Sequence, residues 1–307
     1  MLQGYDERNR DLKVWIDGRL VHRDEAGVSP FDSSVQNGDA VWEGLRLYDG
    51  RIFRLEAHLA RLRQGARALR YEGVPSDDEI VEAIRRTLAA NGMQDGVHVR
   101  LTLSRGVKYT SGLDPRLNTA GCSLFVLAEF KPPVYDRIGV RLITSGVRRP
   151  PADVLDQTIH SCNQLTSILA KLEANAAGVD DAMMLDTRGF LAETNATHLF
   201  LVEDGSLSTP RTVACPEGVT RSVVLELCRE HDIPCREEDL TPARVWRADE
   251  MFCTGTMGEI VPVVEVDGRR IGRAADAEAS VEPLRPMTSR LAELFAARTR
   301  SEGTVVV

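Results

Sequence analysis

The sequence predicts a mixed α/β fold, an α+β mixture in which helices and strands follow one another irregularly. Short runs of β-forming residues flank Asp-Gly pairs near the start of the chain, and Asp-Gly favours the tight turn of an antiparallel hairpin. Further along, segments with helical spacing of apolar residues are interspersed with alternating or continuous apolar segments. A simple repeat of strand, helix and parallel strand is therefore not expected.

The first part of the chain contains hairpin, helix and strand signals in that order. The spacing predicts hairpins at 13–21 and 47–53, and a helix over 55–69 with leucines on one face. Ser76-Asp77-Asp78-Glu79 is a capping box, so a second helix should begin there and end at Asn91-Gly92. Residues 97–104 alternate between apolar and polar, which is typical of a strand with one buried face.

A break in the pattern divides the chain into two predicted domains. Residues 123–128 read as a buried strand, and two consecutive prolines, Pro132 and Pro133, then exclude the interior of a sheet or helix. We place a linker at 132–138, between an N-terminal domain at 1–131 and a larger domain at 139–307. The second domain is predicted to contain strands at 139–144, 181–185, 197–202 and 250–254, and helices at 163–177, 220–229 and 287–297.

The composition indicates a folded protein without a nucleic-acid or membrane partner. Of 307 residues, 43% are hydrophobic, which suffices for one large or two moderate domains. The formal net charge of −8 argues against a surface for nucleic acid or anionic membrane. No stretch approaches the roughly 20 apolar residues of a membrane helix, and the first residues lack the apolar region of a signal peptide. We expect a cytoplasmic protein.

The six cysteines predict neither disulfides nor a metal centre. They are scattered through the chain, form no Cys-x-x-Cys pair, and show no metal-ligand spacing. Reduced thiols and no bound metal are the expectation.

A series of motifs follows in a fixed order along the chain. His58 to Leu62 reads His-x-x-Arg-Leu, and residues 159–165 read Ile-His-Ser-Cys-Asn-Gln-Leu. Gly189-Phe190-Leu191-Ala192-Glu193, Gly218-Val219-Thr220-Arg221 and Thr254-Gly255-Thr256 come next. From about Val14 to Gly272, this succession resembles the class IV aminotransferases, which are pyridoxal-phosphate (PLP) enzymes of fold type IV. The resemblance implies a smaller N-terminal α/β domain, a larger domain with a barrel-like sheet, a cofactor between them, and a homodimer.

The resemblance assigns the cofactor to particular residues. Glu193 would keep the pyridine nitrogen protonated, which makes the ring a better electron sink. Gly218, Val219 and Thr220 open a helix, whose free N–H groups attract a phosphate. Thr256 would add a hydroxyl, and Arg61 a guanidinium suited to phosphate oxygens.

Two arginines are candidates for binding a substrate carboxylate. The context His98-Val99-Arg100 is similar to the Tyr-x-Arg of branched-chain aminotransferases, with His98 in place of the tyrosine, whereas Arg105-Gly106 resembles the D-amino-acid branch. Met257, which the resemblance also places among the substrate-binding residues, stands where the family usually has a smaller residue, and its larger side chain would alter the ordinary substrate pocket. Aromatic residues that could line the pocket are Phe31, Trp42 and Tyr48.

His160 stands where the resemblance expects the lysine that holds the cofactor as a Schiff base. Imidazole forms no stable imine, but a pKa near ~6.5 suits it to proton transfer, so His160 is the candidate catalytic residue. Only four lysines occur in the chain. Lys171 lies 11 residues beyond His160, or roughly 16 Å along a helix axis, which its side chain cannot span. Lys108, on a loop after Arg105-Gly106, is the remaining substitute.

Several functions stay open at this point. The first is an aminotransferase that acts on an amino acid and a 2-oxo acid, with PLP bound without a covalent bond. The second is an ordinary aminotransferase disabled by an introduced histidine, and the third is a non-catalytic homologue that binds PLP or a metabolite. Aminodeoxychorismate lyases share the motifs and give a fourth, although Arg100 and the context of Glu193 favour transamination.

Overall fold

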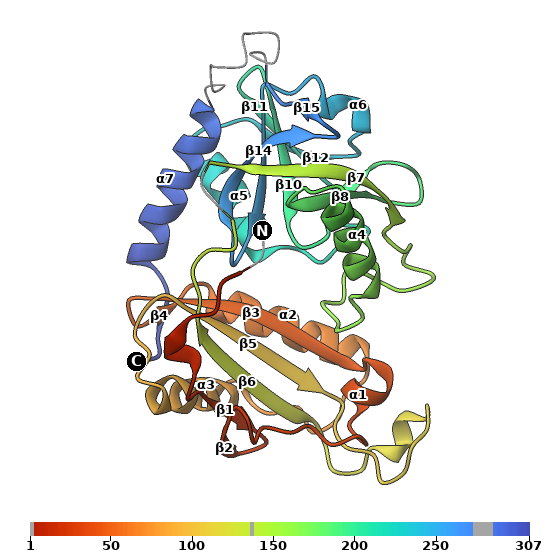
Figure 1. Ribbon diagram of the computed structural model, residues 1–307, viewed down its shortest axis with the longest axis vertical. Helices are drawn as coiled ribbons and strands as arrows, with labels where there is room; N and C mark the ends of the chain where they lie inside the picture. The colour runs from red at the N-terminus through yellow and green to blue at the C-terminus, as the bar shows by residue number, and fades with distance from the viewer. Residues whose placement is uncertain (1–2, 136–137, 273–284) are drawn as a thin grey trace. The chain divides into compact units, whose positions relative to one another are not determined.

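A computed structural model describes residues 3–135, 138–272 and 285–307 (Figure 1). The described chain forms two compact units. The first comprises residues 3–132, 159–163 and 299–307, and the second 133–158 and 164–298. The short segment that carries His160 therefore belongs to the first unit, although it follows the predicted linker along the chain.

The first unit is built on a seven-stranded sheet in the order β16-β4-β3-β5-β6-β1-β2. The hairpins predicted at 13–21 and 47–53 are confirmed, since β1 pairs with β2 and β3 with β4, both antiparallel. The strands are β1 (Lys13–Ile16), β2 (Arg19–His22), β3 (Ala40–Tyr48), β4 (Arg51–Ile52), β5 (Val97–Ser104), β6 (Ser123–Phe130) and β16 (Thr304–Val305).

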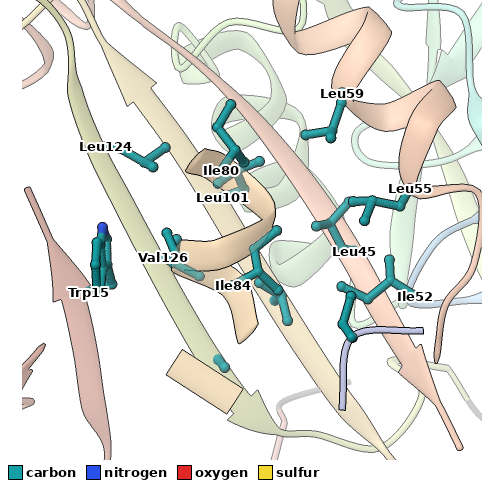
Figure 2. Close-up of a cluster of buried hydrophobic side chains, with 14 of the residues drawn as sticks. Trp15, Leu45, Ile52, Leu55, Leu59, Ile80, Ile84, Leu101, Leu124 and Val126 are labelled. Carbon is teal, nitrogen blue, oxygen red and sulfur yellow. The ribbon is translucent and has the colours of Figure 1, made fainter. Parts of the chain in front are cut away.

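Two amphipathic helices cover one face of this sheet. They are α2 (Leu55–Ala68) and α3 (Asp77–Ala90), and a short α1 (Ser33–Asn37) precedes β3. The predicted capping box is present, with Ser76 and Glu79 bonded reciprocally at the start of α3. Figure 2 shows side chains from both helices meeting those of the strands in one core. The alternation predicted for β5 is confirmed, so His98, Arg100 and Thr102 lie on the face away from this core.

The second unit contains a nine-stranded sheet in the order β12-β11-β10-β13-β14-β7-β8-β9, with β15 paired to β14. Parallel and antiparallel pairs are mixed. Strand β9 is the last in this order, whereas β10 and β11 lie near its beginning. Because β9 nevertheless contacts β10 and β11, the sheet is curled as a half barrel. The strands are β7 (Val140–Arg148), β8 (Asp181–Leu185), β9 (Leu191–Thr194), β10 (His198–Glu203), β11 (Ser206–Pro210), β12 (Cys235–Glu238), β13 (Glu250–Gly255), β14 (Glu259–Val266) and β15 (Arg269–Arg270).

The helices of the second unit match three sequence predictions. They are α4 (Leu165–Ala176), α5 (Val219–Glu230) and α7 (Pro286–Ser301), with a short α6 (Pro242–Val245) in addition. The strands β11 and β14 had no counterpart in the sequence predictions. Within the described ranges, no helix combines the length and apolar character required to cross a membrane.

Candidate active site

A buried carboxylate, Glu43, organises the side chains around His160 in the first unit. Glu43 lies on β3 with no exposed side-chain surface. Arg61 binds it through two nitrogens: Nε donates to Oε1 at 2.8 Å and Nη2 to Oε2 at 2.7 Å. His58 Nδ1 lies 2.6 Å from Oε2, and His160 Nδ1 lies 3.4 Å from Oε1. Three groups that can carry positive charge therefore surround one buried negative charge.

The backbone holds His160 beside β3. Trp42 N donates to His160 O at 3.0 Å, and Cys162 N donates to Ala40 O at 2.8 Å. These bonds add the segment around His160 to the edge of the sheet at the beginning of β3. The imidazole also stacks on the Trp42 ring, with centroids 4.3 Å apart. Both the position and the plane of the His160 ring are thereby fixed.

Electrostatics favour an ionised Glu43 and a neutral His160. Burial opposes ionisation of Glu43, but the charge of Arg61 and hydrogen bonds from Arg61, His160 and His58 outweigh it and hold the pKa of the carboxyl well below its usual range. Burial lowers the pKa of His160, and the charge of Arg61 lowers it further, against the opposing hydrogen bond with Glu43. His160 is consequently a neutral imidazole at neutral pH.

The position of Glu43 also selects the His160 tautomer. A neutral imidazole carries its proton on one ring nitrogen and accepts with the other. Because Nδ1 faces the Glu43 carboxylate, the favourable tautomer has the proton on Nδ1 and a lone pair on Nε2. This arrangement can accept a proton at Nε2.

Arg100 and Arg105, the two candidates for binding a carboxylate, have different surroundings. The Arg100 guanidinium lies 3.6 Å from the Trp42 ring centroid, with Nη2 3.9 Å from Cys162 Sγ, and within the described chain it has no carboxylate partner. Arg105 is engaged with Asp39 through Nε at 2.6 Å and with Leu69 O through Nη2 at 2.9 Å. The geometry therefore favours Arg100.

Arg46 is a further guanidinium on the same sheet face as Arg100. Arg46 is 8% exposed as a whole residue. The Nε and Nη1 atoms of its guanidinium are buried without a hydrogen-bond partner. Arg46 pairs across the sheet with His98. Burial, together with Lys131, Arg100 and Arg46, lowers the pKa of His98 to about 4. This face is hence positively charged and complementary to an anion.

In the second unit, His198 lies among the remaining sequence-predicted motifs. Glu193 is buried in β9, not in an exposed loop, and its Oε2 lies 3.9 Å from His198 Nδ1. Across the sheet, His198 on β10 pairs with Thr254 on β13. A Cβ built on Gly218 would lie 2.2 Å from His198 Cδ2, so the start of α5 touches the same ring. The structure thus brings three of the predicted motifs together.

The first turn of α5 has the properties of an anion cradle. Val219 and Thr220 are its first residues, and Gly218 provides no side-chain cap. The N–H groups of a first helical turn have no partner within the helix. Nearby, Thr254 Oγ1 is buried without a hydrogen-bond partner. Thr256 and Met257 lie in the turn that joins β13 to β14.

Arg149 balances the charge of Glu193. Its Nη2 lies 2.8 Å from Glu193 Oε1, and both side chains are buried. The ligand atoms of Glu193, His198 and Cys215 lie within 4.8 Å of one another, a grouping that could hold a metal ion. Because the Arg149 guanidinium already pairs with Glu193, the site is less attractive to a dication than its donors suggest.

The two lysines considered as substitutes have partners within their own units. Lys108 is 4% exposed, and its Nζ donates to Asn37 Oδ1 and to Gly112 O, both at 2.6 Å. Lys171 Nζ bonds Asp181 Oδ1 at 2.8 Å. Neither amine is presented as an uncommitted nucleophile.

Sequence reasoning missed Glu43, Arg46, Arg149 and His198. A signal existed for Glu43, which interrupts a run in which Val41, Leu45 and Leu47 share its strand face. A carboxylate on a core-facing position requires a cationic partner. No comparable pattern marked Arg149, whose partner Glu193 is distant in sequence. His198 is close to Glu193 in sequence, but it stands at the start of an otherwise apolar strand that gives it no signal of its own.

Known proteins of one family resemble this chain in sequence and in structure. Residues 40–266 match the amino-transferase class IV family. The chain is 46% identical over 299 residues to branched-chain-amino-acid aminotransferase-like protein 2 of Arabidopsis thaliana, covering 97% of this chain but 52% of that protein. It thus spans about half the length of this curated relative.

Two further matches cover their counterparts almost completely. The putative branched-chain-amino-acid aminotransferase of Methanocaldococcus jannaschii is 41% identical over 261 residues, covering 85% of this chain and 90% of that one. The structure of the branched-chain amino acid aminotransferase from Thermobaculum terrenum in its PLP form is 26% identical with a TM-score of 0.82, covering 97% and 99% of the two chains. The chain therefore belongs to the class IV aminotransferase family.

Proposed function

We propose that this protein is a PLP-dependent aminotransferase that transfers an amino group from a branched-chain type of amino acid to a 2-oxo acid. In this proposal His160 takes the place of the family lysine, and PLP binds without a covalent bond to the protein. We further propose that the protein is cytoplasmic and acts as a homodimer. The matched relatives and the PLP form of the Thermobaculum terrenum structure support the substrate class and cofactor.

One observation carries this proposal. Glu193, the start of α5 and the end of β13 meet around His198. A buried carboxylate suits a protonated pyridine nitrogen, and a helix start suits a phosphate. Thr254 Oγ1, buried and unpaired, is a further polar group that a ligand could satisfy. The residues of the second unit therefore fit PLP.

The protein side chains have distinct proposed roles. Bound PLP would supply an electron sink that acidifies the Cα–H bond of an amino acid. Glu193 would hold the pyridine N–H, and the N–H groups of Val219 and Thr220 would hold the phosphate, with Thr256 as a further contact; Arg61, whose Nε and Nη2 already bind Glu43, is not assigned to the phosphate. Arg100 would bind the substrate carboxylate, for which bidentate pairing is favourable.

His160 would move the proton. Its Nε2 would accept the proton lost from the substrate Cα and deliver it to C4′ of the cofactor. The Glu43 carboxylate would stabilise the imidazolium that exists between these two transfers. The low pKa of His160 makes the neutral base available at neutral pH. Activity governed by this group is expected to fall as acid protonates it.

The test is a PLP titration of the wild-type protein followed by dialysis and borohydride reduction. We expect saturable binding that is lost on dialysis, with no borohydride-stable adduct, and turnover of leucine, isoleucine or valine with 2-oxoglutarate. A stable adduct on any lysine would contradict the role of His160. PLP binding without turnover of any donor would replace the proposal by the non-catalytic alternative.

Glu193→Gln is expected to weaken PLP binding by about 10- to 100-fold, because one charge-assisted hydrogen bond to the pyridine is lost. The measurement is the PLP dissociation constant by absorbance or fluorescence titration. Glu203→Gln is a matched control in the same unit, since Glu203 also pairs with an arginine, Arg244, and neither residue belongs to the predicted motifs. Equal affinity in Glu193→Gln and the control would remove Glu193 from the cofactor site.

Gly218→Ala is expected to reduce PLP affinity at least ~10-fold, because the added Cβ would lie 2.2 Å from the His198 ring and displace the start of α5. Gly27→Ala serves as the control, since a Cβ there meets nothing within 4 Å. Titration with inorganic phosphate in parallel separates loss of the anion cradle from loss of pyridine contacts. Unchanged affinity for both ligands would exclude the cradle.

A further inference from the structure

Helix α5 and strand β12 bring two cysteines of the second unit together. Cys228 lies near the end of α5, and Cys235 is the first residue of β12. Between them the chain turns back at Asp232, whose φ is 53°, and Ile233 N donates to Cys228 O at 2.8 Å. The two cysteines are therefore positioned by one ordered turn, although they belong to different elements.

The two thiols are in direct contact. A side-chain hydrogen bond joins Cys228 and Cys235, and both are free cysteines. Cys228 is 1% exposed, whereas Cys235 is partly exposed and lies on β12, the strand that begins the order of its sheet. A disulfide forms readily only between cysteines that already point toward each other. A small oxidant can consequently reach Cys235 from solvent, with the Cys228 sulfur beside it.

Arg221 supplies a buried positive charge to this pair. It lies on the same face of α5 as Cys228, two helical turns earlier. Arg221 is 1% exposed, and its Nη2 binds Glu237 Oε2 at 2.6 Å, so the guanidinium reaches the strand that carries Cys235. Its Nη1 is buried without a hydrogen-bond partner. A cation in this position favours the thiolate of a nearby cysteine over the thiol.

These contacts give the two sulfurs different roles. The hydrogen bond from Cys228 holds the pKa of Cys235 below its usual range, and the charge of Arg221 adds to this effect, although burial opposes it. The same hydrogen bond, together with burial, raises the pKa of Cys228. Cys235 is thus the sulfur that ionises and attacks, and Cys228 is the sulfur that retains its proton.

We infer that Cys235 and Cys228 form a redox-active dithiol, in which hydrogen peroxide oxidises Cys235 and Cys228 then closes an intramolecular disulfide. The inference rests on the contact between the two sulfurs, on the exposure of only one of them and on the buried charge of Arg221. It is independent of the proposed aminotransferase chemistry, which uses neither thiol. In a reducing compartment the pair remains a dithiol until an oxidant is present.

The oxidation proceeds in two balanced steps. The Cys235 thiolate attacks one oxygen of hydrogen peroxide, the O–O bond breaks, and the leaving hydroxide takes up a proton to become water. The Cys228 sulfur then attacks the sulfur of the sulfenic acid, the S–O bond breaks, and the departing hydroxide takes the Cys228 proton as a second water. The two cysteines lose two electrons in total, which reduce one peroxide to two waters. The disulfide ties the end of α5 to β12, and a dithiol reductant reverses it.

The test is peptide mass spectrometry of the full chain after treatment with hydrogen peroxide and blocking of the remaining thiols with iodoacetamide. Because Arg229 lies between the two cysteines, trypsin separates them into peptides 222–229 and 230–236. We expect these peptides to be joined by a disulfide, with the loss of two hydrogens, and to be released by dithiothreitol. Cys122 is the internal control: it is also partly exposed, but burial raises its pKa to about 11, so it should react at least ~10-fold more slowly than Cys235.

Two serine variants separate the roles of the sulfurs. In Cys228→Ser, Cys235 should accumulate as the sulfenic acid, which dimedone traps, and then as the sulfinic acid, because no second thiol closes the disulfide. In Cys235→Ser, the buried Cys228 should react with peroxide at least ~10-fold more slowly than Cys235 does in the wild type.

Three results would overturn the inference. The first is wild-type Cys235 that passes to the sulfinic acid without linking the two peptides, and the second is a disulfide from Cys235 to a cysteine other than Cys228. The third is equal reactivity of Cys235 and Cys122. Because the readout is the mass of peptides, a chain that fails to bind PLP would refute the proposed function and leave this result unaffected.

Discussion

His160→Lys is expected to convert reversible PLP binding into covalent attachment and to raise the rate of branched-chain transamination by at least ~100-fold. The physical reason is that the lysine amine would restore an imine link that imidazole cannot form. The site also suits a neutral amine, because the burial and the Arg61 charge that lower the pKa of His160 would lower that of a lysine. Absorbance, borohydride trapping and peptide mass spectrometry identify the attachment site.

The matched control is His231→Lys, which introduces the same amine at an exposed residue after α5. It should show no stable adduct after dialysis and no gain in rate. If His160→Lys forms no adduct, position 160 is not equivalent to the family lysine. If it forms the adduct but gains no activity, the substrate pocket differs as well, which would direct attention to Met257 and His98.

Glu43→Gln is expected to have the largest effect on stability, about 3–5 kcal/mol in the free energy of unfolding. The substitution leaves Arg61 without its bidentate carboxylate partner in a site where Glu43 has no exposed surface. Urea unfolding followed by tryptophan fluorescence and circular dichroism measures the loss. Glu7→Gln, in an exposed ion pair with Arg10, is the control and should change little.

The difference in the free energy of unfolding between the wild type and Glu43→Gln has a defined pH dependence. The pKa of Glu43 is well below its usual range in the folded protein, so its contribution is fully present above the unfolded pKa of ~4.3. As the pH falls through the folded pKa, the contribution disappears. The advantage of the wild type over Glu43→Gln should thus be constant near neutrality and diminish in strong acid. A difference that persists unchanged in acid, or a loss at neutral pH no larger than that of Glu7→Gln, would contradict the role of Glu43.

Local signals in the sequence predicted most elements because their causes are local. The Asp-Gly turn between β1 and β2, the capping box at Ser76 and the alternation in β5 all depend on residues a few positions apart. Strands β11 and β14 were missed although each forms a hairpin with the strand before it, with Asp204-Gly205 as the turn between β10 and β11. Their other pairings, with β12 and β7, join strands more distant in sequence. The exposed leucines of α4 show a different limit, since periodicity indicates a helix but not which apolar face is covered.

For the candidate site, the order of motifs in the sequence predicted its components and the family. Glu193, the start of α5 and the Thr254–Thr256 segment were recognised from their succession alone. Their common neighbour His198 was not, because strand pairing between β10 and β13 and the packing of Gly218 place it there. The choice of Arg100 over Arg105 likewise depended on Asp39, a partner 66 residues away in sequence.

The sequence by itself determined that the chain has the class IV motifs, that lysine is scarce and that position 160 is a histidine. What that histidine can do was decided by the tertiary structure. Burial and Arg61 make it neutral, and Glu43, from a strand more than one hundred residues earlier, directs its proton to Nδ1. A pKa and a tautomer depend on charges and dielectric within a few ångströms in space, and only the folded chain brings those groups together.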